Sequence, residues 1–185
     1  STLGILTARM TDRPIRPLFP AGFKNEVQII GTSLSVDQET PLDILSIIGA
    51  SAALTISDIP FEGPISATQM GCIENNLIVN PTYEQLESSE LDLIGAGSMS
   101  GLIIMAAGAK DWPESVSRPA IEKAQQVNED VIALQLELIE SNGKEKSEFK
   151  STAYPEELDS DFLPKVFKFG KGIVGQVCEQ RQIIY

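Results

Sequence analysis

The chain of 185 residues is acidic, and its composition excludes several classes of protein. It carries 14 Lys and Arg against 26 Asp and Glu, with 42% hydrophobic and 22% charged residues. These fractions are ordinary for a globular domain, but a net charge of −12 argues against nucleic-acid binding over the whole surface, which requires rows of cations. The lack of histidine and the distant cysteines, Cys72 and Cys178, exclude a zinc site and a Ser-His-Asp triad and fit a reducing compartment.

Residues 7–20 combine three arginines with three prolines. Arg9, Arg13 and Arg16 stand at spacings of four and three, so one face of a helix can carry all three. The prolines restrict the backbone and lower the entropy cost of holding the arginines in place. Because a guanidinium matches the geometry of phosphate oxygens, we expect an anion-binding clamp here. The alternative is that the arginines pair with Asp12 and nearby acids.

The distribution of charge favours the clamp. No Lys or Arg occurs between Asn25 and Ala109, whereas eleven acidic residues do. A positive spot kept in an otherwise acidic chain indicates a function. The chain does not start with Met and begins inside a helical pattern, so we expect it to be a piece of a longer protein.

Between residues 26 and 60 the pattern predicts one strand and one helix. Residues 26–36 are mostly β-branched and apolar, which predicts a buried strand. A helix is expected from Pro41 to Ser57, with Thr40 as its N-cap and Pro41 at its first position. Gly49 lies among small residues in the middle of that helix, so we expect the helix to pack closely on a sheet there.

Beyond residue 60 the pattern predicts antiparallel strands and a long helix. Strands are expected over 65–73 and 77–79, joined by a turn at Glu74-Asn75-Asn76, and over 91–97 and 101–108. A helix is expected from 117 to 141. Its apolar stripe is formed by Ile121, Ala124, Val127, Val131, Leu134 and Leu138.

The last part of the chain differs in character. Asn142-Gly143 closes the long helix, residues 144–161 have the composition of a linker, and residues 162–185 show no clear period. The order of helix, strand, helix, antiparallel strands and helix predicts an α+β sandwich.

Several segments resemble the polynucleotide phosphorylase family. The most specific is Arg-Pro-Ile-Arg-Pro-Leu-Phe-Pro at residues 13–20, within a match over residues 7–23. The helix of residues 41–60 matches as well. The remaining matches are Gly63-Pro64-Ile65, Ile78-Val79-Asn80-Pro81-Thr82, Leu91-Asp92-Leu93 and Ala96-Gly97. The resemblance is to the back part of the family's first RNase PH-like core, followed by the start of the linker between two cores.

The resemblance implies a fold, a reaction and an assembly. The fold is an α+β, RNase PH-like βαβ sandwich of the ribosomal protein S5 domain 2-like type, truncated at its N-terminus. Residues 1–143 form the first, degenerate core, and residues 144–185 form a linker or the start of the helical inter-core region. The family is a polyribonucleotide nucleotidyltransferase that degrades RNA from the 3′ end with inorganic phosphate and releases nucleoside diphosphates. The resemblance therefore implies a ring-like homotrimer in the bacterial cytoplasm or an organellar matrix. Its expected partners are single-stranded RNA and RNA-degradation proteins.

The resemblance also assigns RNA binding to arginines of this chain. Arg13 and Arg16 match arginines of the first core that grip RNA near the mouth of the central channel, and Arg9 joins them on the same predicted face. The arginine-rich loop that precedes this segment in the family is missing from the chain. This core is therefore expected to position RNA and to build the ring.

No catalytic residue and no metal ligand are expected in this chain. The stretch Pro41-Leu42-Asp43 lacks the serines that hold phosphate in the active core, and its carboxylate would repel phosphate. Leu86 and Ile94 stand where an aspartate and a lysine act, which leaves Asp92 alone. Since Mg²⁺ requires several acidic ligands, the metal and the chemistry are expected in the second core.

Two other interpretations stay open from the sequence. The chain can belong to a non-catalytic RNase PH-like subunit of an exosome-type ring, in which inactive proteins pair with active ones. It can also be an acidic α+β domain that binds a small anionic metabolite at the arginine segment. The sequence that follows Tyr185 and the oligomeric state of the intact protein discriminate between these interpretations.

Overall fold

A computed structural model describes residues 2–23, 25–109 and 114–148. The chain divides into two compact units, residues 1–149 and 150–185. The second unit lies outside the described residues, and so do the expectations for most of the linker and for residues 162–185. The division of the chain into a core of residues 1–143 and a following region stays a prediction.

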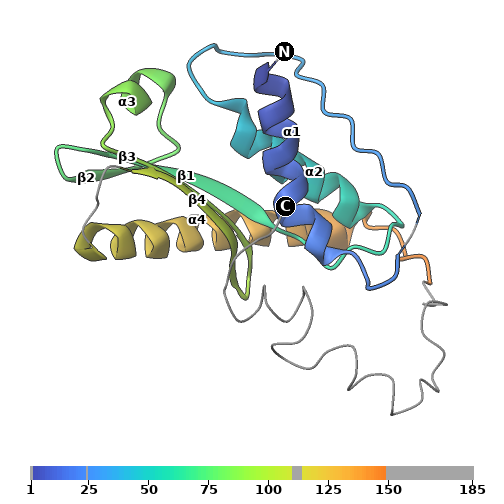
Figure 1. Ribbon diagram of the computed structural model, residues 1–185. Helices are drawn as coiled ribbons and strands as arrows, with labels where there is room; N and C mark the ends of the chain where they lie inside the picture. The colour runs from blue at the N-terminus through green and yellow to red at the C-terminus, as the bar shows by residue number, and fades with distance from the viewer. Residues whose placement is uncertain (1, 24, 110–113, 149–185) are drawn as a thin grey trace, which may run out of the picture. The chain divides into compact units, whose positions relative to one another are not determined.

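A four-stranded antiparallel sheet forms the centre of the described fold (Figure 1). Its strands are β1 (Ser66–Ile73), β2 (Asn76–Val79), β3 (Leu91–Ser98) and β4 (Gly101–Ala109), in the order β2-β1-β3-β4. Each pair of neighbours is antiparallel. The predicted strands after residue 60 are therefore confirmed.

The turn of the first hairpin is one residue shorter than expected. Glu74 and Asn75 have positive φ angles of 49° and 63°, whereas Asn76 already belongs to β2 and pairs with Ile73. Two-residue hairpin loops with positive φ at both positions match the right-handed twist of the strands. The turn is therefore Glu74-Asn75, and of the expected turn Glu74-Asn75-Asn76 only the last residue belongs to the strand instead.

The two faces of the sheet are covered by different helices (Figure 1). Met70 and Cys72 of β1 pack with Leu93 of β3 against α4 (Glu114–Asn142). On the other face, Ala67 and Ala96 join a core with α1 (Thr2–Ile15) and α2 (Leu42–Ile56). The short helix α3 (Tyr83–Ser88) begins with a capping box and contacts β1. The result is an α+β layered fold, as predicted.

The long helix α4 confirms the expected element, but its buried stripe differs from the expected one. The residues on its fully buried line are Ala120, Ala124, Asn128, Ile132 and Gln135. Of the expected stripe, Ala124 is buried and Ile121 packs against the same core, whereas Leu134 is 64% exposed and Leu138 is also exposed. The apolar pattern alone misplaced the second half of the stripe because Asn128 and Gln135 are polar. Both are buried through hydrogen bonds to the sheet and α2.

Helix α2 begins one residue later than predicted. Its N-cap residue is Pro41, without a side-chain cap, because the hydroxyl of Thr40 donates to the carboxylate of Asp37 instead. The N–H and O–H groups of Thr40, together with the N–H of Glu39, lower the pKa of Asp37. The expected N-cap role of Thr40 is therefore wrong.

The expected close packing of Gly49 on a sheet is also wrong. Gly49 is exposed, and a Cβ atom at this position would have no neighbour within 4 Å. The buried residues of α2 are Ile44, Ile47, Ala50, Ser51, Leu54 and Thr55. Gly49 faces away from them because it lies on the opposite side of the helix, together with Leu45 and Ala53, which are exposed.

Residues 26–36 do not form the predicted strand. They have no regular secondary structure, and most of their side chains are exposed, with Leu34 at 95% and Ile30 at 78%. Val27 alone among them packs against the core beside α2. A strand requires a hydrogen-bonded neighbour, and none of the four strands in the described sheet pairs with this segment.

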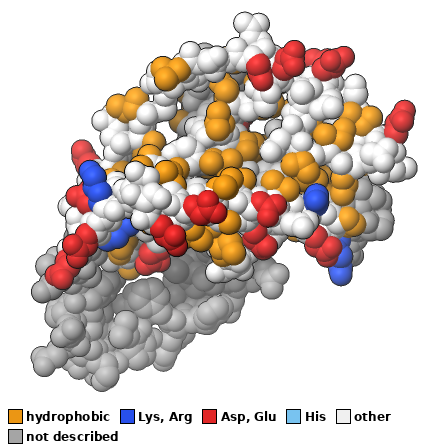
Figure 2. All heavy atoms as spheres, turned by 180° about the vertical axis from the view of Figure 1, so that it is seen from behind, with side chains coloured by type: hydrophobic (Ala, Val, Ile, Leu, Met, Phe, Trp, Pro, Cys, Tyr) orange, Lys and Arg blue, Asp and Glu red, His pale blue; other side chains and the backbone are white. Residues whose placement is uncertain are grey.

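Exposed apolar side chains occur on more than one helix. On the face that Figure 2 shows, apolar side chains gather over the middle, acidic ones are spread across it, and basic ones are few. The exposed large residues include Leu45 of α2 and Leu134 of α4. Among the described residues, no helix combines the length and the apolar character that crossing a bilayer requires.

Candidate functional site

The arginine segment is built on helix α1, whose inner face is fixed to α2. Thr11 is buried, and its hydroxyl donates to the carbonyl of Thr7 at 2.9 Å and lies 3.1 Å from the hydroxyl of Ser46. The hydroxyl of Thr7 donates to the carboxylate of Asp43 in α2. Ile15 is buried in the core that α1 shares with α2. These contacts determine which way the outer face points.

The end of the segment is fixed as firmly. Residues 16–18 continue α1 as a single turn of 3₁₀ helix, η1 (Arg16–Leu18). The carbonyl of Leu18 accepts a hydrogen bond of 2.8 Å from the N–H of Glu62. The ring of Phe19 stacks on Phe23 at 5.6 Å and packs against Phe61 at 5.7 Å between centroids. The backbone that carries the arginines is therefore held at both ends.

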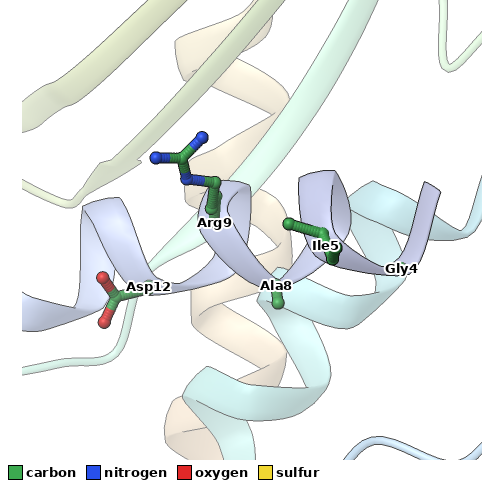
Figure 3. A pocket seen from close by; sticks show the side chains of 5 residues that line it. All are labelled: Gly4, Ile5, Ala8, Arg9 and Asp12. Atoms are coloured by element: carbon green, nitrogen blue, oxygen red, sulfur yellow. The ribbon is translucent and has the colours of Figure 1, made fainter. Parts of the chain in front are cut away.

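The structure places all three predicted site residues on exposed surface of this segment. Arg9 and Arg13 lie in α1, and Arg16 begins η1. Arg9 lines an open hollow together with Gly4, Ile5, Ala8 and Asp12 (Figure 3). In Figure 3 the guanidinium of Arg9 extends away from the carboxylate of Asp12.

Arg16 has a partner within its own helix. Its Nη2 atom donates to Asp12 Oδ2 at 2.8 Å, and its Nε atom donates to the same oxygen at 3.0 Å. The pair is solvent-exposed, with side-chain exposures of 76% for Arg16 and 52% for Asp12. An exposed pair at this spacing contributes only about 0.3–0.5 kcal/mol. The pairing with Asp12, which the sequence left as the alternative, therefore occurs for Arg16.

This arrangement can bind an anion on a surface of mixed character. Ile5 and Ala8 supply apolar surface to the hollow that Arg9 also lines. A phosphate that approaches Arg16 has to compete with Asp12, and the weakness of the exposed pair makes this competition feasible. The surface is open and not enclosed by other elements, so it fits an extended ligand better than a small molecule that must be surrounded.

The positions that carry chemistry in the resembling family are occupied differently here. Asp43 is engaged by the hydroxyl of Thr7 in the first turn of α2. Asp92 lies exposed near the start of β3 and accepts a hydrogen bond of 2.7 Å from Gln69 Nε2. Ile94 packs against the core. Among the described residues, no group of three or more acidic, cysteine or histidine side chains could hold a metal ion.

Sequence reasoning missed two features of this surface. One is the role of Thr7 and Thr11, whose spacing of four on the face opposite Arg9 and Arg13 was a usable signal for the inner side of α1. The other is the apolar part of the hollow, Ile5 and Ala8, which lie four residues before Arg9 and Asp12, respectively.

Two family models match the chain in succession. The model described as the 3′ exoribonuclease family, domain 1, matches residues 1–60. The model described as the 3′ exoribonuclease family, domain 2, matches residues 63–127. Together they account for more than half of the chain. The first model ends with α2, and the second contains the sheet and the first half of α4.

Similar proteins of known name agree with these matches. The polyribonucleotide nucleotidyltransferase of Natranaerobius thermophilus is 47% identical over 156 residues, which is 84% of this chain and 22% of that protein. The corresponding protein of Bacillus licheniformis is 45% identical over 166 residues, 90% of this chain and 23% of that protein. The chain thus spans less than a quarter of the length of these relatives.

A solved structure has a similar fold. Rrp46 from rice, Oryza sativa, superposes with a TM-score of 0.50 at 17% sequence identity, covering 55% of this chain and 49% of that chain. This likeness concerns the fold alone. With both domain models of one family matched in order, and with a layered α+β fold of the same kind, the chain belongs to the 3′ exoribonuclease family.

Proposed function

We propose that the chain is a piece of a phosphorolytic 3′→5′ exoribonuclease, a polyribonucleotide nucleotidyltransferase. In this proposal the enzyme degrades single-stranded RNA with inorganic phosphate and releases nucleoside diphosphates. The similarity to relatives with that name supports the reaction. The chemistry and Mg²⁺ are assigned to another core of the polypeptide, because the described residues do not form a metal site.

The role of this chain is to hold RNA and to build the assembly. The observation that carries this role is the exposed face of α1, where Arg9, Arg13 and Arg16 stand on a backbone fixed at both ends. Arginines can contact successive phosphates of a single strand and accept any base sequence. The homotrimeric ring, RNA-degradation partners and a bacterial cytoplasmic or organellar location are part of the same proposal.

The division of labour can be tested by phosphorolysis. The intact protein, incubated with single-stranded RNA, inorganic phosphate and Mg²⁺, is expected to release nucleoside diphosphates. The purified chain of 185 residues is expected to release none, because it lacks the serine, aspartate and lysine positions described above. Omitting phosphate provides the control, since a phosphorolytic enzyme then stops and a contaminating hydrolytic nuclease does not.

Three outcomes would overturn the proposal. Phosphate-dependent release by the chain alone would show that this core is catalytic. An intact protein that binds RNA but releases no nucleoside diphosphate would favour a non-catalytic subunit of an exosome-type ring. An intact protein that does neither, yet binds a small phosphorylated metabolite at α1, would favour the anion-binding domain.

A further inference from the structure

The segment that leaves α4 makes a dense set of contacts with the end of α2. Helix α4 ends at Asn142, and the N–H of Gly143 donates to the carbonyl of Ile139 at 2.7 Å. The N–H of Lys144 then donates to the carbonyl of Ile56 at 3.0 Å. The N–H of Ser147 donates to the carbonyl of Asp58 at 2.8 Å. Residues far apart in the sequence are thus joined through the main chain.

The ammonium group of Lys146 lies at the centre of these contacts. Its Nζ atom donates to the carbonyls of Leu54 at 3.0 Å, Thr55 at 2.9 Å and Ser57 at 2.9 Å. The last four carbonyls of a helix have no partner within the helix, and they carry its partial negative charge. A cation with three donors satisfies both the geometry and the charge of this end. Burial lowers the pKa of Lys146, and the carboxylate of Asp58 opposes that shift.

The carbonyl groups in the last turn of α2 accept most of their hydrogen bonds from residues outside the helix. Lys146 satisfies the carbonyl of Thr55, and the N–H of Lys144 satisfies that of Ile56. Leu54 receives hydrogen bonds from Lys146 and also from Ser57, whose hydroxyl donates at 2.7 Å. The C-terminal turn of α2 is therefore completed by the chain that follows α4.

We propose that residues 144–147 form a strap that fastens the exit of the chain from α4 to the last turn of α2, with the side chain of Lys146 as its fastener. The strap is a conformational device that holds residues 144–147 against the end of α2. Opening it would free four residues, and at about 3.3–3.6 Å per extended residue this adds roughly 13–14 Å of reach. The device does not rest on the proposed function.

Hydrogen exchange on the full chain tests the strap. The variant is Lys146→Met, which keeps the length of the side chain and removes its charge and donors. The matched control is Lys144→Met, which removes the same charge from the same segment and leaves the main-chain hydrogen bond to Ile56 in place. We expect the amides of residues 144–147 to exchange roughly tenfold faster in Lys146→Met, with little change in Lys144→Met. Lys146→Arg, which retains donors and charge, is expected to restore part of the protection.

The rest of the core shows whether the effect is local. Amides of β1 and of the middle of α4 are expected to keep their protection in Lys146→Met, because the strap lies outside the sheet and its helix layers. If strap and core lose protection together, Lys146 stabilises the whole fold and the strap is not a separate device. If Lys146→Met and Lys144→Met behave alike, the Lys146 side chain is not the fastener. Either result overturns the proposal.

Discussion

Asp12 decides how much positive charge the outer face of α1 presents. It lies four residues before Arg16 and binds its guanidinium through both carboxylate oxygens. It also lines the same hollow as Arg9. The sequence contained this information, because a spacing of four between opposite charges brings them together on a helix. Which of the two uses of Arg16 prevails, the ion pair or a phosphate, depends on the ligand.

Replacing Asp12 by Asn is expected to strengthen RNA binding by the intact protein. The change removes a competing anion next to Arg16 and a repulsive charge next to the RNA backbone. Affinity for single-stranded RNA is expected to rise about threefold to tenfold at low salt, and the gain should shrink as salt screens it. Fluorescence anisotropy with labelled RNA measures the change. The matched control is Asp130→Asn on the exposed side of α4, and an equal gain in both variants would show a general charge effect only.

Two buried polar residues determine how α4 sits on the sheet. Asn128 donates to the carbonyl of Gly95 and accepts from Thr68. Gln135 donates to the carbonyl of Ile65 and accepts from the hydroxyl of Ser51, which itself accepts from the N–H of Ile65. These bonds connect α4 with β1, β3 and α2 in one register. Apolar periodicity cannot reveal these hydrogen bonds. The helix was therefore predicted, but the burial of Asn128 and Gln135 was not.

Gln135→Ala is expected to destabilise the fold by about 1–3 kcal/mol. The substitution leaves the carbonyl of Ile65 without its side-chain donor in a buried position and removes the acceptor of Ser51. Urea unfolding followed by circular dichroism measures the loss as a lower midpoint. Gln126→Ala, at an exposed position of the same helix, should stay within about 0.5 kcal/mol of the parent chain. An unchanged midpoint in Gln135→Ala would mean that the buried network contributes no net stability.

Helix α2 shows how composition misled the sequence interpretation. Its run of small residues predicted contact with a sheet at Gly49, but the sheet lies on the side of Ile47, Ala50 and Leu54. The side of Gly49 is open in the described structure. Small residues indicate that another element can pack closely on the helix, but they do not indicate on which side of the helix it packs.

Gly49→Ala is therefore expected to stabilise the chain, by about 0.5–1 kcal/mol, since alanine loses less entropy in a helix and its Cβ meets no neighbour. Gly97→Ala in β3 is the contrasting variant. A Cβ there would collide with the carbonyl oxygen of Gly101 and lie 2.7 Å from the Cα of Leu102, so a clear loss is expected. Thermal unfolding of both variants provides the comparison. A loss of stability in Gly49→Ala would show that this side of α2 is covered in solution.

At the scale of the whole molecule, the sequence predicted the strands after residue 60 and the helices α2 and α4. It also predicted that the three arginines lie in a helical segment. It failed for residues 26–36, where β-branched composition predicted a strand but the described sheet offers no neighbour. A strand depends on a partner that local sequence does not specify, whereas α1 and α4 satisfy their backbone within themselves. The pairing of an arginine with Asp12 was also open from the sequence, and the structure shows that Arg16 makes it.

The three arginines of residues 9–16 are an exception to the acidic character of the chain. The chain has a net charge of −12, yet it presents Arg9, Arg13 and Arg16 on one fixed and exposed segment. Long-range attraction of RNA to so acidic a chain is weak, so binding must come from local contacts with phosphates. Such contacts release counterions, and this release can be counted from the dependence of affinity on salt.

The most direct test is the salt dependence of single-stranded RNA binding by the intact protein. The variant Arg13→Ala/Arg16→Ala is compared with the parent and with Arg118→Ala/Lys123→Ala, a control of equal charge on the exposed side of α4. Each phosphate contact contributes about 0.7 to the slope of log K against log salt for single strands. The slope is expected to fall by about 1.4 in Arg13→Ala/Arg16→Ala and to stay unchanged in the control. If Arg13→Ala/Arg16→Ala keeps the slope and affinity of the parent, Arg13 and Arg16 do not contact RNA phosphates, and the proposed RNA-binding role of this segment is wrong.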